Sequence, residues 1–85
     1  MPIAKIGKAG SALVYDAKVV AKTDVYHSFP TMMDDWILRG GTVGKQAANY
    51  VEYHMPGYVN GAPGTYQIGI DTVRNAITHR FFMPQ

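Results

Sequence analysis

The apolar residues of this chain change their spacing near its middle. Before Gly40 they recur at intervals of three and four positions, and from Gln46 onward they alternate with other residues. The first spacing places side chains on one face of a helix, whereas alternation places them on one face of a strand. The sequence therefore predicts an α+β domain, with N-terminal helical structure packed on a small antiparallel sheet.

The helical spacing covers residues 28–39. Ser28 suits the N-cap, Pro30 is tolerated in a first turn, and Gly40–Gly41 predicts a left-handed C-terminal stop. His27 then lies just before the helix, where exposed backbone N–H groups favour anions. The apolar stripe that we expect to be buried consists of Phe29, Met32, Met33, Trp36 and Ile37.

Alternation after Gln46 predicts a meander of three or four strands. The expected strands contain residues 51–55, 66–70 and 77–82, with a bend at Pro56–Gly57 and an end at Pro84. Turns are expected at residues 60–64 and 73–75. A helix on one face of such a sheet leaves the other face open.

The N-terminal part of the chain carries weaker signals. Residues 1–12 are small and glycine-containing, and we expect a linker or the cut end of a longer chain, followed by one domain over residues 13–85. Residues 13–25 mix alternation with alanines and favour a helix or a helical turn. The glycine-rich residues 40–44 predict a helix cap followed by a flexible connection.

Composition excludes several classes of protein. The chain has no cysteine, which excludes a disulfide scaffold, a cysteine-ligated zinc site and a cysteine nucleophile. A net charge of +2 permits an anionic partner. No window approaches 18 apolar residues, so we expect no membrane span, and without an N-terminal apolar region we expect any export to depend on a larger protein.

Three histidines, His27, His54 and His79, are the residues best suited to proton transfer near neutral pH. Cleavage of RNA by its 2′-hydroxyl requires a base for that proton, an acid for the leaving 5′-oxygen and a cation for the phosphate. Two histidines and a nearby arginine or lysine satisfy these needs without a metal or another cofactor.

His79 is the strongest single candidate. It lies in the run Thr78-His79-Arg80, and alternation places it with Ile77 and Phe81, while Arg80 lies on the opposite face unless a bulge intervenes. The other reading is a histidine at the edge of the core and a solvated arginine. We expect His27 and His79 to divide the acid and base roles, with Arg80 or Arg39 at the phosphate.

Substrate contacts are expected from four further residues: Arg39, Lys45, Tyr53 and His54. The first two flank the glycine-rich loop, which can approach a backbone phosphate closely. The loop lacks the spacing and the Ser or Thr of a nucleotide-binding P-loop. Tyrosines on an open sheet face stack unpaired bases, although tyrosines in small sheets also serve as packing residues.

A metal site is the weaker alternative. The three histidines with Glu52 and Asp71 supply suitable ligand types, but no pair has a recurrent ligand spacing.

From Tyr26 onward the layout of the chain contains three recognisable segments. These segments are Tyr-His-Ser-Phe-Pro at 26–30, Met-Pro-Gly-Tyr-Val-Asn-Gly at 55–61 and Ile-Thr-His-Arg-Phe-Phe at 77–82. They resemble the C-terminal nuclease modules of bacterial polymorphic toxins, including contact-dependent growth inhibition systems. Many of these modules share the fold grouped under barnase, EndoU, colicin and RelE-type ribonucleases.

This resemblance implies an α+β ribonuclease that often acts on tRNA and is neutralised by a cognate immunity protein. By position, His27, Thr78, His79 and Arg80 would form the site, assisted by Arg39 or Lys45. It also implies delivery as part of a larger secreted or cell-surface protein and action in the target-cell cytoplasm. The mild net charge argues against tight nonspecific RNA binding and leaves room for a specific target or a host helper protein. The alternatives are a non-catalytic protein-binding module and a DNase, whose usual dependence on divalent ions fits this sequence poorly.

Overall fold

The computed structural model describes residues 13–22, 24 and 26–85. In chain order, the elements are β1 (Val14–Tyr15), α1 (Ala17–Val20), α2 (Met32–Gly40), β2 (Thr42–Ala47), β3 (Tyr50–Val59), β4 (Ala62–Asp71) and β5 (Ala76–Pro84). The linker expected at residues 1–12 lies outside the described residues. No helix in the described part of the chain is long and apolar enough to cross a membrane.

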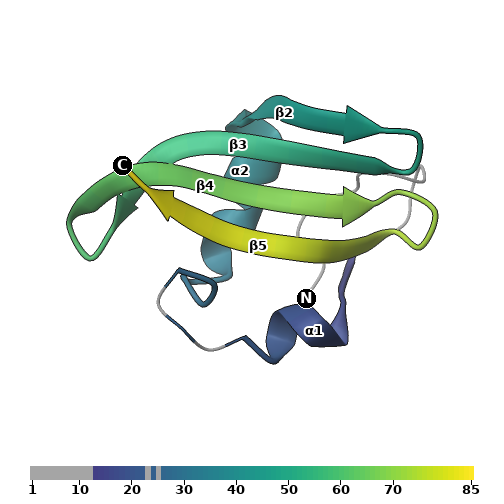
Figure 1. Ribbon diagram of the computed structural model, residues 1–85, viewed down its shortest axis with the longest axis horizontal. Helices are drawn as coiled ribbons and strands as arrows, with labels where there is room; N and C mark the ends of the chain where they lie inside the picture. Colours follow the sequence, from purple (N-terminus) through teal and green to yellow (C-terminus); the bar gives the residue numbers. More distant parts are fainter. Residues whose placement is uncertain (1–12, 23, 25) are drawn as a thin grey trace.

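The strands form one sheet in the order β1-β5-β4-β3-β2 (Figure 1). Strands β2 to β5 form an antiparallel meander, whereas β1 runs parallel to β5. The α+β class is confirmed, but the expected antiparallel sheet of three or four strands is in fact a mixed sheet of five. The sequence did not predict β2, because all six of its residues are exposed and show no apolar alternation. It did not predict β1 either, because two residues are too few to show a period.

The helix α2 begins later than predicted. Its N-cap is Thr31 rather than Ser28, whose hydroxyl instead donates to the backbone carbonyl of Asp24. Gly41 follows the helix with φ −77° and ψ 170°, which is extended and not left-handed. A Cβ at Gly41 would lie 2.5 Å from the Ile37 carbonyl oxygen, so glycine is needed here for a close approach between segments.

The buried face of α2 also differs from the predicted stripe. Asp34, Ile37 and Leu38 are buried, whereas Met32 and Trp36 are 73% and 65% exposed. The physical reason is that a buried arginine of the sheet faces this side of the helix and requires the Asp34 carboxylate. Hydrophobic spacing alone cannot predict a helix face that contains a paired charge.

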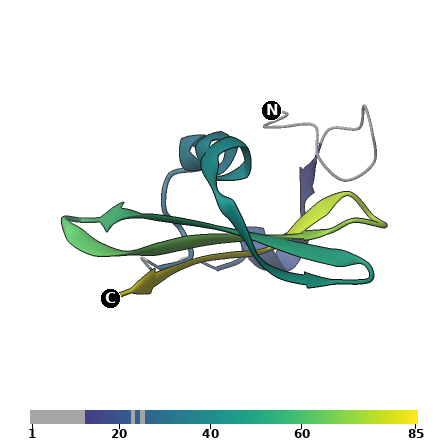
Figure 2. The same cartoon turned by 90° about the horizontal axis from the view of Figure 1, so that it is seen from above.

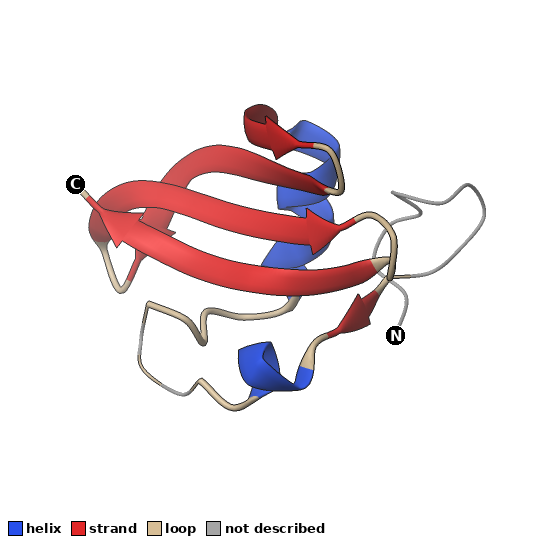
Figure 3. Cartoon of the chain, turned by 45° about the vertical axis from the view of Figure 1, so that its right-hand side comes forward, coloured by secondary structure: helices blue, strands red, loops and turns tan. Residues whose placement is uncertain are grey.

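The helix covers only one face of the sheet, as the edge-on view shows (Figure 2). Between them lies a core whose most deeply buried apolar residues are Ile37, Ile68, Ile70, Ile77 and Phe82. We call the sheet face away from α2 the far face; Figure 1 looks onto it. The described part of the segment between α1 and α2 runs along the β5 edge (Figure 3), where the Phe82 backbone N–H donates to the Tyr26 carbonyl.

A register shift in β5 decides which of its residues reach each face. Gly69 pairs with His79 and the next residue, Ile70, pairs with Ile77, so Thr78 is the extra residue of a bulge. The bulge places Ile77 on the same side as Arg80, facing the core, and leaves His79 on the far face. The expectation that His79 shares a face with Ile77 is therefore wrong, because the bulge at Thr78 separates them. Arg80 stays on the face opposite His79, as alternation predicted.

Candidate functional site

A row of polar and aromatic side chains crosses the far face. Its members alternate along their strands with residues that face α2, and the strand register places them side by side. We call it the far-face row, and it consists of Tyr50, Glu52 and His54 on β3, Gln67 on β4, and His79 and Phe81 on β5. Two of the three candidate histidines therefore share one surface.

Glu52 lies at the centre of the row. The Tyr50 hydroxyl donates to one carboxylate oxygen at 2.6 Å, and His54 Nε2 lies 2.7 Å from the other. His79 Nε2 is 3.9 Å from the carboxylate. Burial raises the pKa of Glu52, but the hydrogen bonds from Tyr50 and His54 outweigh this effect and lower it overall. The row therefore has an ionised carboxylate between two imidazoles at neutral pH.

Two glycines make room for this arrangement. Gly69 pairs with Glu52 on one side and with His79 on the other, and a Cβ added to it would lie 1.9 Å from the Tyr50 hydroxyl oxygen. A Cβ added to Gly44 of β2 would lie 2.4 Å from the His54 ring. The side chains of Tyr50 and His54 thus occupy the space that a Cβ atom at position 69 or 44 would need.

The environment of His79 favours the neutral ring. Its side chain is about one-third exposed, and Nε2 lies 3.0 Å from the Gln67 side-chain oxygen. Burial lowers the pKa of His79, and the charge of Lys22 acts in the same direction, against the opposing effect of Glu52. If Nε2 donates to Gln67, Nδ1 is the nitrogen that can accept a proton.

His27 extends the row beyond the sheet edge. Its ring centroid is 5.0 Å from that of Phe81, and the Phe81 centroid is 6.2 Å from that of His79. The Asp24 carboxylate lies 2.7 Å from His27 Nδ1. Asp24 thus gives a protonated His27 an ion-pair partner, and all three histidines belong to one continuous surface.

Arg80 holds the main chain around His27 in place from the α2 side of the sheet. This side chain points toward α2 and is 4% exposed. It donates to the backbone carbonyls of His27, Phe29 and Pro30 and, at 2.8 Å, to the Asp34 carboxylate. Arg80, expected at the phosphate, therefore contacts the scaffold that positions His27.

Asp34 completes this buried network. Its second oxygen accepts a hydrogen bond from the Tyr15 hydroxyl at 2.6 Å. Burial and the neighbouring Asp34 carboxylate raise the pKa of Tyr15. The network thus joins β1, α2, β5 and the segment that carries His27.

The remaining predicted residues are dispersed. Arg39 is exposed on α2, where it pairs with Asp35, and Tyr53 packs against the core on the α2 side. Thr78 is the bulged residue. Lys45 is exposed on β2 and pairs in register with Glu52, which places it at the β2 end of the far-face row.

Three residues near the histidines were not predicted to belong to a ribonuclease site: Glu52, which was considered only as a metal ligand, Gln67 and Lys22. Glu52 had a visible signal, because alternation places it on the same strand face as His54. Gln67 and Lys22 had none, since their positions depend on strand register and on the packing of α1.

The described side chains include no group of three or more His, Asp or Glu residues arranged to bind a metal ion. Comparison of the chain with protein-family models, curated protein sequences and solved structures finds no match. The functional argument therefore rests on the geometry of the far-face row.

Proposed function

We propose that this domain is a ribonuclease that cleaves RNA through its own 2′-hydroxyl, without a metal, and that the far-face row with His27 is its active site. The observation that carries the proposal is that the rings of His27 and His79 both lie next to Phe81, with centroid distances of 5.0 Å and 6.2 Å. One ring has an environment that favours its neutral form, and the other has a carboxylate partner. A base must be neutral to take a proton, and a carboxylate partner can orient the ring that acts as the acid.

In the proposed reaction, His79 takes the proton of the 2′-hydroxyl. The 2′-oxygen then attacks the adjacent phosphorus atom. The bond to the 5′-oxygen breaks, and that oxygen receives a proton from His27. The products are a 2′,3′-cyclic phosphate and a free 5′-hydroxyl. His79 then carries the proton of the substrate, and His27 is neutral.

The negative charge on the phosphate requires a cation near both histidines. Arg80 is unsuited to this role because its guanidinium is buried against Asp34. Lys22 is exposed, and its charge acts on His79. We therefore assign phosphate stabilisation to Lys22 and place Lys45 at the opposite end of the row, where it contacts a more distant part of the RNA backbone.

Phe81 lies next to both proposed catalytic rings and is half-buried on the far face. An aromatic surface of this kind stacks an unpaired base, which is how single-stranded RNA is commonly held on open sheets. Tyr53, which was expected to stack, faces the core instead. The proposal therefore assigns base stacking to Phe81.

The family resemblance extends the proposal to partners and delivery. On that ground, the substrate is tRNA, a cognate immunity protein neutralises the domain, and a host protein can assist it. The domain would be delivered by a larger secreted or cell-surface protein and would act in the target-cell cytoplasm.

Controlled expression in bacteria tests the proposal. Wild-type protein should arrest growth and release discrete RNA fragments on a denaturing gel, and His79→Ala should abolish both effects. Arg39→Ala, which changes an exposed residue outside the row, is the matched control and should act as wild type. Intact RNA in cells that contain folded wild-type protein would refute the proposal.

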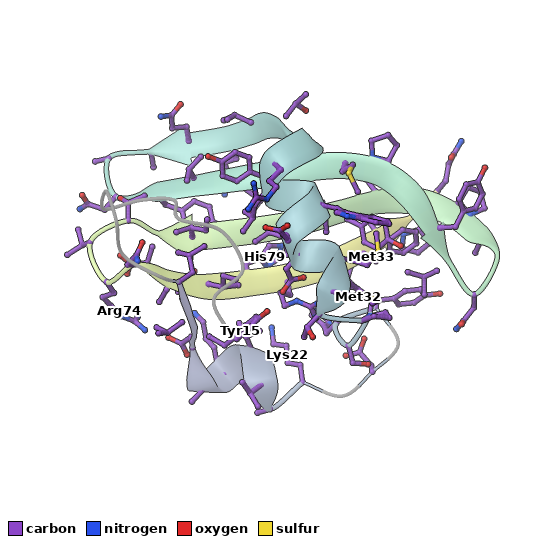
Figure 4. The ribbon with its side chains drawn as sticks, turned by 180° about the vertical axis from the view of Figure 1, so that it is seen from behind. Tyr15, Lys22, Met32, Met33, Arg74 and His79 are labelled. Carbon is purple, nitrogen blue, oxygen red and sulfur yellow. The ribbon has the colours of Figure 1, made fainter. Side chains whose placement is uncertain are left out.

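A non-catalytic protein-binding module is the second candidate, and one observation favours it. Met32 and Trp36 are exposed one turn apart on α2, where they could contact another protein (Figure 4 labels Met32). Loss of partner binding in Trp36→Ala, together with intact RNA in cells that express wild type, would favour this module over the nuclease.

A further inference from the structure

A pocket of about 270 Å³ opens at the β5 edge, between α1 and the segment that leads into α2. One wall is formed by Val19 and Val20 of α1, and the other by Phe29 and Pro30 of the segment that leads into α2. His27 also lines it. Apart from His27 and Lys22, the proposed cleavage mechanism uses none of the residues that form this pocket.

The ionisable side chains that line the pocket determine which ligand charge it suits. Its ionisable lining residues are Tyr15, Lys22, His27 and Arg80, and none of the described lining residues carries a carboxylate. The Arg80 guanidinium forms an ion pair with the buried Asp34 carboxylate. The Asp24 carboxylate lies 2.7 Å from His27 Nδ1, so Lys22 is the cation of the described lining that is placed for an anion. Figure 4 shows Tyr15 of β1 and Lys22, which follows α1, extending toward β5.

Size and lining together define the chemical class of the ligand. Pockets for drug-sized molecules begin near 300 Å³, so this volume suits one flat ring system rather than a larger group. Apolar walls suit the faces of such a ring, and a cationic end suits a phosphate. A nucleotide combines both features.

His27 connects the pocket to the proposed reaction. Its ring contacts Phe81 of the row, and the same residue lines the pocket. Because His27 is the proposed acid, the pocket lies beside the 5′-oxygen that leaves. We propose that the pocket binds the nucleobase of the nucleotide on the leaving side of the scissile phosphate, and so sets a sequence preference; this inference rests on the proposed function.

Titration with single nucleotides tests the pocket apart from cleavage. The four nucleoside 5′-monophosphates are added in turn to methyl-labelled protein, and the methyl signals of Val19 and Val20 are followed by NMR. We expect saturable shifts at both valines with at least one nucleotide. Inorganic phosphate serves as the second probe, and equal shifts with phosphate alone would overturn recognition of the base.

A matched pair of variants tests the location. Val20→Trp places a bulky side chain at the pocket and changes a residue that is 68% exposed, so the core is not disturbed. Val14→Trp makes the same change at a residue of β1 that is 57% exposed and does not line the pocket. Val20→Trp should abolish the Val19 shifts and reduce the preference among RNA sequences, while Val14→Trp should retain both.

The two proposals can fail separately. If wild-type protein cleaves RNA but nucleotides do not shift the Val19 and Val20 signals, the pocket proposal is wrong and the ribonuclease proposal stands. If nucleotides shift the Val19 and Val20 signals but the protein cleaves no RNA, the ribonuclease proposal is wrong and the pocket is a nucleotide-binding site. Equal sequence preference in wild type and Val20→Trp would also count against the pocket.

Discussion

Arg80 of β5 and Asp34 of α2 are 46 positions apart in the chain, yet their side chains meet at 2.8 Å inside the protein. Both side chains are buried, with exposures of 4% and 0%. The Arg80 guanidinium also lies 3.9 Å from the centre of the Phe29 ring. One ion pair thus fixes the helix on the sheet and the segment of His27 beside it.

Asp34→Ala should lower the free energy of unfolding by about 3–5 kcal/mol, because it leaves the Arg80 charge buried without its partner. This is a large part of the total for a small domain. Denaturant unfolding followed by circular dichroism measures the change.

The neighbouring residue is the control for this prediction. Asp35 pairs with Arg39 at the surface of the same helix, and Asp35→Ala should cost less than about 1 kcal/mol. If Asp34→Ala does not fold, the pair Asp34→Leu with Arg80→Met, which removes both charges, should restore folding. Equal costs at positions 34 and 35 would contradict the assigned network.

Gly69→Ala should disturb the far-face row, because the new methyl group would overlap the Tyr50 hydroxyl and displace it from Glu52. We expect a loss of about 1–3 kcal/mol in stability, as for overpacked sites, and a clear loss of RNA cleavage. Chemical denaturation and a cleavage assay on the purified protein measure the two effects.

A double-mutant cycle separates the clash from other effects of the substitution. In a Tyr50→Ala background, Gly69→Ala has nothing to displace, and its cost in stability should largely disappear. An undiminished cost in that background would show that the overlap with Tyr50 is not the cause.

The stability of the domain should depend on pH through His79. Its pKa in the folded protein is lowered by burial, so the unfolded chain binds the proton first as pH falls below about 6.5. Stability from this residue is therefore present above that pH and is lost as pH falls through the lower, folded-state value. His79→Gln should reduce this slope in unfolding experiments across the range.

The same shift predicts the acid limb of activity. A base must be neutral, so kcat/KM should fall with decreasing pH only below the ordinary histidine range. Glu52 also has a lowered pKa, but it acts in a separate window, below about 4.5. An acid limb centred above 6.5 would exclude His79 as the base.

Cleavage should continue undiminished in the presence of a chelator, because histidines and a lysine provide the acid, base and cation. The fragments should end in a 2′,3′-cyclic phosphate, which resists phosphatase until it is opened by acid. Loss of activity with the chelator and its return with magnesium would contradict this mechanism.

Local signals account for the parts of the fold that the sequence predicted. Asn60 and Gly61 have φ values of 51° and 81°, as a two-residue hairpin turn requires, and both residue types favour that conformation. Alternation then fixed the face of each residue in β3 and β4. These features depend on neighbours a few positions away.

Features that depend on distant residues were missed. The burial of Asp34 follows from Arg80, and β1 forms because Val14 pairs with Ala76 at the other end of the described chain. In the candidate site, chemistry alone singled out the histidines. The central place of Glu52 depends on strand register across Gly69, which no local pattern encodes.

The parallel pairing of β1 with β5 also sets an order of events during synthesis. Strands β2, β3 and β4 pair with neighbours that are close in the sequence, whereas the β-ladder partners of β1 and the Arg80 hydrogen bond to the His27 carbonyl come from β5. Chains are made from the N-terminus, and contacts across long loops form last. The far-face row can therefore assemble only after β5 has emerged from the exit tunnel of the ribosome.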